Sequence, residues 1–134
     1  MLFGFTEALY LAGEGEQAAA LAPLIGQALA MGHEWMALDG RLIQTRAGIA
    51  AAAARRWNEA EHDYQAALRV AEALGSRIEQ ADLCRLHARM LLDRDQPGDR
   101  DRAETQLWKA GDTYRAIGMP RYEALTSTLI AEAQ

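Results

Sequence analysis

Three glycines recur at an interval of 43 residues, and this spacing constrains the fold more than any other feature of the chain. They are Gly32, Gly75 and Gly118, and each follows an alanine and a large apolar residue. Self-similarity at a period of this length is typical of stacked helical hairpins, because each hairpin buries its apolar face only against its neighbours. The sequence therefore predicts a helical repeat protein.

The composition favours a single all-α domain. Alanine runs at 18–20 and 50–54 stand among Leu, Glu, Arg and Gln, which are strong helix formers. Half of the 134 residues are hydrophobic, which is enough to bury a continuous core between repeats. We expect one domain, residues 1–134, that forms an α-solenoid of about seven helices. Its antiparallel hairpins cover about 1–32, 33–75 and 76–118, and a final helix covers 120–133.

Capping signals mark the ends of the expected helices. Asn58 followed by Glu61, and Asp101 followed by Glu104, predict capping boxes at two helix starts. Gly75 is predicted to take the left-handed position after its helix, and Gly32 and Gly118 are predicted to end theirs. Pro23 lies inside the expected second helix, where its ring removes a backbone donor and predicts a kink or a late start.

Residues 56–68 carry a recognisable pattern of large and small side chains. Trp57 precedes the helix, Ala60 stands four positions before Tyr64, and an Ala-Leu pair follows at 67–68. The pattern resembles the second helix of a tetratricopeptide repeat. The resemblance implies paired helices over essentially the whole chain, and it places Gly48 where the first helix of the motif carries a close-contact glycine.

The other two repeats depart from that pattern. In the third, Ala103, Leu107 and Ala110 keep it, but Gly111 stands where Leu is expected, and in the first Gln17 replaces the small residue. The 43-residue period is also longer than that of the tetratricopeptide family and falls in the HEAT and armadillo range. HEAT-like interaction repeats are therefore an alternative.

Residues 88–103 and 116–120 resemble the helical repeats that trail large bacterial signalling ATPases, nucleotide cyclases and ATP-dependent transcription regulators. The resemblance implies a cytoplasmic protein-protein interaction or regulatory scaffold module, a fragment of a larger bacterial signalling or transcription-regulatory protein. A small-ligand sensor that binds an effector between its helices is an alternative of a different class.

The net charge and the sequence pattern argue against several classes of protein. A net charge of −5 opposes direct binding to nucleic acid, because such affinity comes largely from Lys and Arg neutralising phosphates. Glu7 interrupts the apolar start, which also lacks a basic flank, so we expect neither a signal peptide nor a membrane span. The single cysteine, Cys84, allows no internal disulfide, favours the cytoplasm and is predicted to be a buried thiol.

Residues of the types used in catalysis and metal binding do not form a recognisable motif in the sequence. His33, His62 and His87 have no metal-ligand spacing. Ser76 and Ser127 stand in no nucleophile elbow, and the Asp and Arg residues of 93–102 alternate as in a charged loop. We expect no enzyme activity, cofactor or metal.

A partner groove is predicted on the first helix of each hairpin. Helical spacing and the 43-residue shift select three stripes: Trp35, Leu38, Leu42, Thr45 and Ile49; Ile78, Ala81, Arg85, Ala88 and Leu92; and Arg121, Ala124 and Thr128. The groove would hold a protein segment or peptide, with Arg85 and Arg121 gripping an acidic group in a bidentate fork. The alternative is that several of these residues form core between repeats.

The N-terminal helix is a second candidate surface. Phe3, Phe5, Leu9 and Tyr10 give it an apolar face with no polar capping unit before it, and terminal repeats need such a cap. Either further repeats precede this helix in the natural protein, or its face pairs with a second copy of the chain. We expect self-association, as a homodimer through this helix.

Overall fold

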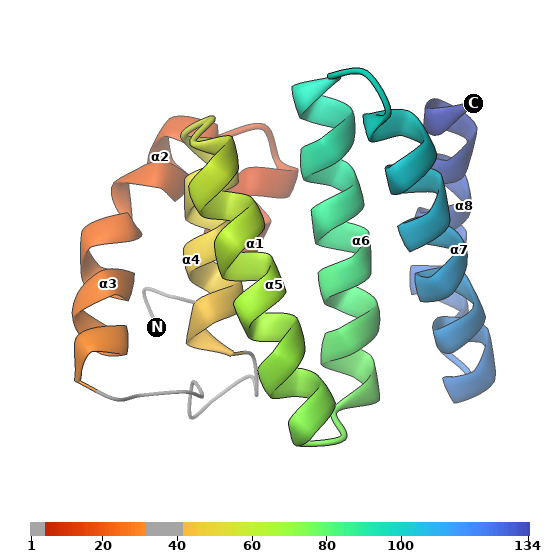
Figure 1. Ribbon diagram of the computed structural model, residues 1–134, viewed down its shortest axis with the longest axis horizontal. Helices are drawn as coiled ribbons and strands as arrows, with labels where there is room; N and C mark the ends of the chain where they lie inside the picture. Colours follow the sequence, from red (N-terminus) through yellow and green to blue (C-terminus); the bar gives the residue numbers. More distant parts are fainter. Residues whose placement is uncertain (1–4, 32–41) are drawn as a thin grey trace. The chain divides into compact units, whose positions relative to one another are not determined.

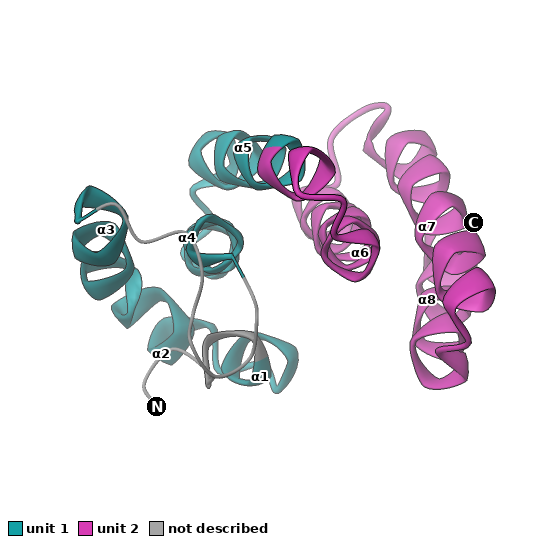
Figure 2. Ribbon diagram, turned by 90° about the horizontal axis from the view of Figure 1, so that it is seen from below, with its two compact units in different colours: residues 1–69 teal, residues 70–134 magenta. Residues whose placement is uncertain are grey.

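The computed structural model describes residues 5–31 and 42–134 (Figure 1). Every regular element in these two ranges is an α-helix, which confirms the predicted all-α class. The helices are α1 (Phe5–Leu11), α2 (Gly15–Ala20), α3 (Ala22–Ala30), α4 (Ile43–Ala53), α5 (Trp57–Ala73), α6 (Arg77–Arg94), α7 (Asp99–Ile117) and α8 (Pro120–Ala133). The chain divides into two compact units, 1–69 and 70–134, with the boundary inside α5 (Figure 2).

In the first unit, α4 is the central helix and packs against α1, α2 and α3. Its core is formed by Ile25 of α3 with Ile43 and Ala50 of α4, all three almost fully buried. Half-buried apolar residues pack against them, namely Leu21 just before α3, three residues of α3, and Ala47 of α4. The many alanines of α4 are the reason that three helices approach it, because a small side chain keeps the interaxial distance short.

The expected second helix is two helices. Helix α2 ends at Ala20, Leu21 separates the two, and α3 begins at Ala22 with Pro23 in its first turn. Proline is tolerated there because the first backbone N–H groups of a helix have no partner within it. The expected effect of Pro23 is therefore confirmed as a new helix start.

Gly48 of α4 makes the close contact that the family resemblance implied. A Cβ atom at this position would lie 2.5 Å from Cδ1 and 2.6 Å from Cε1 of Tyr64 in α5. Both residues are buried, and the tyrosine is only 1 % exposed. The aromatic ring thus packs directly against the backbone of α4, which only glycine permits.

The second unit consists of the last residues of α5 followed by α6, α7 and α8. Helix α7 packs against both α6 and α8. Ala81 and Cys84 of α6 pack against Ala110 and Tyr114 of α7, and Met119 and Tyr122 lie against this cluster. The thiol of Cys84 is buried as predicted, and burial raises its pKa.

Positions 43 residues apart in α5 and α7 share the same burial. At each of four positions both residues are no more than 1 % exposed: Ala60 and Ala103, Tyr64 and Leu107, Ala67 and Ala110, Ala71 and Tyr114. The repeat seen in the sequence is therefore also a repeat of buried faces.

Helix ends agree with the glycine prediction and differ from the capping prediction. Gly75 has a φ of +67°, the left-handed conformation expected of it, and Gly118 ends α7 as expected, with a φ of +85°. Gly32 lies outside the described residues. Helices α5 and α7 begin at Trp57 and Asp99, so Asn58 and Asp101 lie inside the first turn rather than before it. The prediction that these two residues cap their helices is wrong.

Candidate functional site

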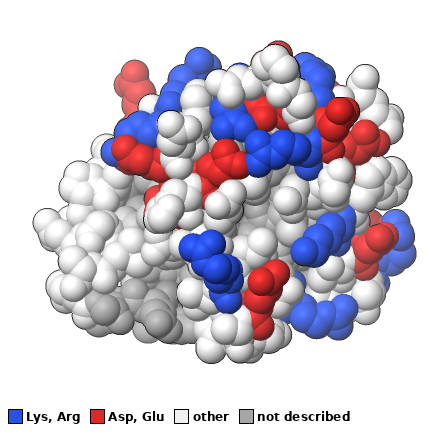
Figure 3. All heavy atoms as spheres, viewed as in Figure 1, with Lys and Arg blue, Asp and Glu red and all other residues white. Residues whose placement is uncertain are grey.

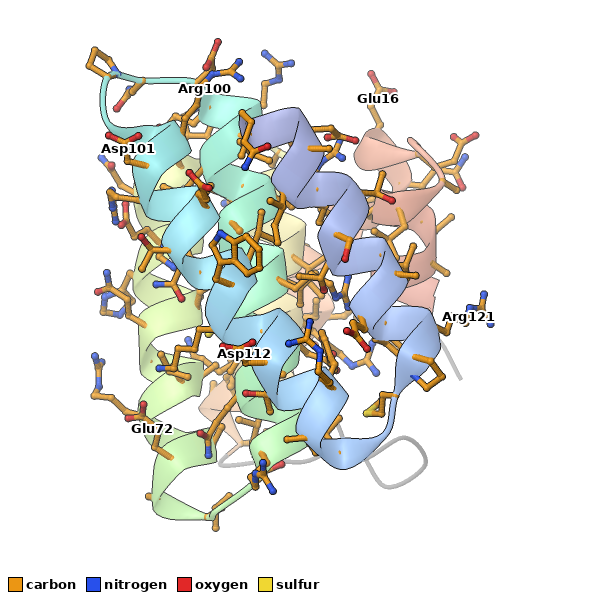
Figure 4. All side chains as sticks on the ribbon, turned by 90° about the vertical axis from the view of Figure 1, so that its right-hand side faces the viewer. Glu16, Glu72, Arg100, Asp101, Asp112 and Arg121 are labelled. Atoms are coloured by element: carbon orange, nitrogen blue, oxygen red, sulfur yellow. The ribbon has the colours of Figure 1, made fainter. Side chains whose placement is uncertain are left out.

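The residues predicted to line a partner groove lie in different environments. Leu42 and Thr45 are buried in the first unit, and Arg85 is buried on α6 in the second. Arg121 is exposed at the start of α8, and its side chain extends away from the helix (Figure 4). Trp35 lies outside the described residues. The burial of the first three is what the alternative interpretation, core between helices, expects.

Arg85 belongs to a polar network inside the second unit. The Tyr114 hydroxyl of α7 donates a hydrogen bond to Oδ1 of Asp82 and accepts one of 3.2 Å from Nε of Arg85. Nη2 of Arg85 lies 3.7 Å from the same Asp82 oxygen, and both side chains are buried. Because Asp82 and Arg85 are one turn apart on α6, the network ties α6 to α7.

Helix α8 adds an aromatic ring to this network. The Arg85 guanidinium carbon lies 5.7 Å from the centre of the Tyr122 ring, within the range of a cation–π contact. The rings of Tyr122 and Tyr114 are 5.4 Å apart. Helices α6, α7 and α8 therefore all contribute to the environment of one buried arginine.

The electrostatics of the network keep Tyr114 protonated. Burial is the largest cause and the Asp82 carboxylate the next, and both raise the pKa of the Tyr114 hydroxyl far above its ordinary value. The hydroxyl is therefore a hydrogen-bond donor to the carboxylate at every physiological pH. The sequence predicted that Arg85 binds an acidic group of a partner. In the structure it lies instead beside the Asp82 carboxylate of its own helix.

Replacing Tyr114 with phenylalanine is expected to lower the free energy of unfolding by about 1.5 kcal/mol, since the change removes a hydrogen bond to a buried carboxylate. Urea denaturation measures the effect. Tyr122→Phe is the matched control, because its hydroxyl makes no hydrogen bond within the described ranges and its ring remains. Equal effects of the two changes would contradict a stabilising role of the Tyr114 hydroxyl.

The loop between α6 and α7 is held by a second buried ion pair. Arg94 donates two hydrogen bonds to Asp99, 2.8 Å from Nε to Oδ2 and 2.6 Å from Nη2 to Oδ1. The backbone N–H of Gln96 donates to Oδ2 at 3.0 Å. The hydrogen bonds from Arg94 are the main reason that the pKa of Asp99 is lowered. The predicted charged loop is therefore an ordered clamp with one buried carboxylate.

Groups able to hold a metal ion are lacking among the described residues. No cluster of three or more His, Cys, Asp or Glu side chains occurs there. His62 is exposed and His87 is buried. His33 lies outside the described ranges.

The predicted self-association edge is described only in part. Leu9 and Tyr10 are half-buried in α1, which packs against α2 and α4. Phe3 and the side chain of Phe5 lie outside the described part. Dimerisation through this edge stays a prediction.

Within the described ranges, none of the helices combines the length and the apolar character needed to cross a bilayer.

Sequence reasoning missed Asp82, Tyr114 and Asp99 as partners. The spacing of Asp82 and Arg85, three residues apart in a helix, is a signal that could have indicated their pairing. Tyr114 gives no such signal, because it meets them only through the packing of α7 on α6.

Comparison with known proteins gives no family for the chain: no family model, curated protein or solved structure matches it.

Proposed function

We propose that the chain is a tetratricopeptide-like helical-repeat module that binds a protein partner within a bacterial regulatory or signalling assembly and catalyses no reaction itself. The observation that carries the proposal is a helical face that is covered on α6 and open on the corresponding part of α8.

On α6 the face is closed by the next helix. Ala81, Cys84, Arg85 and Ala88 are at most 4 % exposed. Ala81 and Cys84 pack against Ala110 and Tyr114 of α7, and the Arg85 Nε atom donates to the Tyr114 hydroxyl. Small residues on this face let the two helices approach closely.

On α8 the same positions are open. Counting 43 residues on from the covered face gives Ala124, Ser127, Thr128 and Ala131, all exposed. Leu125 beside them is 46 % exposed. We name these five residues the α8 face. By analogy with α6, it is suited to an amphipathic helix of a partner, which would bury it as α7 buries its counterpart.

Arg121 gives the α8 face a charge preference. It is exposed at the start of the helix and takes part in no ion pair within the described residues. A partner helix with an acidic residue near Arg121 would therefore gain a charge-assisted hydrogen bond. Of the residues that the sequence selected for a partner groove, Arg121 is therefore kept as a proposed contact.

The α8 face can be tested in the source cells with a photo-crosslinking amino acid at position 128 and, as a control, at exposed position 73. We expect one crosslinked protein from position 128 and none from position 73. Ala124→Arg should lower the yield about tenfold, because a long charged side chain blocks the approach of a helix, which costs about 1.4 kcal/mol or more. Ala73→Arg should have no effect.

Two results would contradict the proposal. One is equal crosslinking from positions 73 and 128, and the other is a yield that Ala124→Arg leaves unchanged. The intact mass of the native protein in its source cells gives separate information. A mass well above that of the 134-residue chain would support a module of a larger protein.

A further inference from the structure

The first unit contains a cavity of about 560 Å³ beside α3, α4 and α5. This volume lies within the range of small-molecule sites. Figure 2 shows α4 between the other two helices. Small or apolar residues form most of the lining, among them Gly26 and Leu29 of α3 with Ala47 and Ala51 of α4. The surface over α3 carries no charged side chain in Figure 3, in agreement with its sequence.

Charged side chains line the cavity from one direction only. They are Arg56, just before α5, and Glu59 and Asp63 on that helix. Nη1 of Arg56 lies 3.0 Å from Oε2 of Glu59, so these two largely neutralise each other. Asp63 is left as the net negative charge of the lining.

Asp63 is held as a partly desolvated anion. Nε2 of Gln44 donates to its Oδ1 at 2.5 Å, and this is the only hydrogen bond that the carboxylate receives from the described residues. The side chain is half-buried, and burial is the main cause that raises its pKa. A carboxylate has about four acceptor sites, so Oδ2 retains capacity for a donor.

We propose that this cavity binds a small organic ammonium ion, whose apolar body lies against α3 and α4 and whose ammonium group donates a hydrogen bond to Asp63. A cation is favoured over a neutral or anionic group because the lining carries one unneutralised carboxylate. An apolar body is favoured because the remaining walls are alanine, glycine, proline and leucine. The site goes beyond the partner binding proposed for α8.

Three probes of similar shape test the charge requirement on the full chain: 2-phenylethylammonium, 2-phenylethanol and 3-phenylpropionate. Titrations followed by ¹H–¹⁵N NMR at pH 7 give their affinities. We expect the ammonium to bind about tenfold more tightly than the alcohol, as for one charge-assisted hydrogen bond, and the carboxylate to bind weakest. The shifted amides should lie in α3, in α4 and in the first turns of α5.

Variants test the assigned residues. Asp63→Asn should reduce the affinity for the ammonium to that for the alcohol, because the amide keeps the shape and removes the charge. Asp112→Asn is the matched control, since it removes one exposed carboxylate from α7 in the second unit and should change nothing. Gly26→Leu should abolish binding of the ammonium and the alcohol, because a Cβ there meets nothing within 4 Å and the side chain can occupy the cavity.

Several outcomes would overturn the proposal. They are no binding of the ammonium at about 10 mM, where even a weak ligand of this size is detected, equal binding of ammonium and alcohol, or an affinity that Asp63→Asn leaves unchanged. Binding that persists in a folded Gly26→Leu variant would also place the ligand elsewhere. Should Gly26→Leu fail to fold, the three probes with Asp63→Asn decide the question alone.

Discussion

Replacing Asp99 with alanine is expected to lower the free energy of unfolding by about 3 kcal/mol or more, as when one partner of a buried ion pair is removed. The side chains of Asp99 and Arg94 are only 3 % and 8 % exposed. The change removes the acceptor of two hydrogen bonds from Arg94 and of one from the Gln96 backbone. The α6–α7 loop would lose the group on which its polar contacts converge.

Asp101→Ala is the matched control for this change. Asp101 is an aspartate in the same first helical turn, and it lies exposed on α7 (Figure 4). Its loss removes a similar interaction with the helix dipole and should cost no more than about 1 kcal/mol. Urea denaturation of both variants at pH 7 gives the comparison. A loss at Asp99 as small as that at Asp101 would show that the clamp does not stabilise the fold.

The stabilisation by Asp99 should also depend on pH, in a direction that its pKa fixes. The pKa of Asp99 is lower in the folded chain than its ordinary value, chiefly because of the hydrogen bonds from Arg94. The stabilisation is therefore complete above the unfolded pKa of about 3.9 and is lost as the pH falls through the folded pKa. The stability difference between the natural chain and Asp99→Asn should be constant near neutrality and shrink below about pH 4. A difference that grows in acid would contradict the assignment.

The loop illustrates what the sequence could predict and what it could not. Alternating Asp and Arg residues over 93–102 indicated a charged loop, and the structure has ion pairs there. Nothing in the alternation distinguishes Asp99 from Asp95, which is exposed. Burial of one carboxylate depends on how Gly98, with φ of +85°, turns the chain into α7, and that is a property of the folded loop.

Local signals predicted the secondary structure well for a physical reason. Helix formation and the left-handed residue after a helix depend on neighbours within a few positions, so the all-α class and the conformation of Gly75 could be derived. Two helices begin one or two residues before the predicted caps, Asn58 and Asp101. This small difference changes which side chain can reach the free backbone N–H groups.

Long-range partners were beyond the sequence. Arg85 was selected because helical spacing placed it on a face with apolar neighbours, and a charged residue on such a face reads equally as a ligand contact or as half of an internal pair. Tyr114, 29 residues away, decides between them by bonding to both Arg85 and Asp82. The cavity beside α3 has the same origin, because only the packing of three helices brings Gly26 and Asp63 to one space.

The last prediction concerns the contact between Gly48 of α4 and the ring of Tyr64. Gly48→Ala is expected to lower the free energy of unfolding by about 2 kcal/mol, the balance of about 3 for overpacking against about 1 gained in helix propensity. The added Cβ would lie 2.5 Å from a ring carbon of Tyr64, and the buried ring has little room to move. Gly111→Ala is the matched control: its Cβ would lie 3.6 Å from Cγ2 of Thr126, an ordinary contact, so it should stabilise by up to about 1 kcal/mol.

A second change tests whether the ring is the cause. The positions 43 residues after Gly48 and Tyr64 are Leu91 and Leu107, both fully buried, so this repeat accepts two medium side chains where the other has a small and a large one. Tyr64→Leu in the Gly48→Ala background should therefore recover about 1–2 kcal/mol relative to the sum of the single changes, a coupling measured by a double-mutant cycle in urea. If the two changes are additive, the absence of a side chain at Gly48 is not what accommodates the Tyr64 ring, and the contact between these two residues does not contribute to stability.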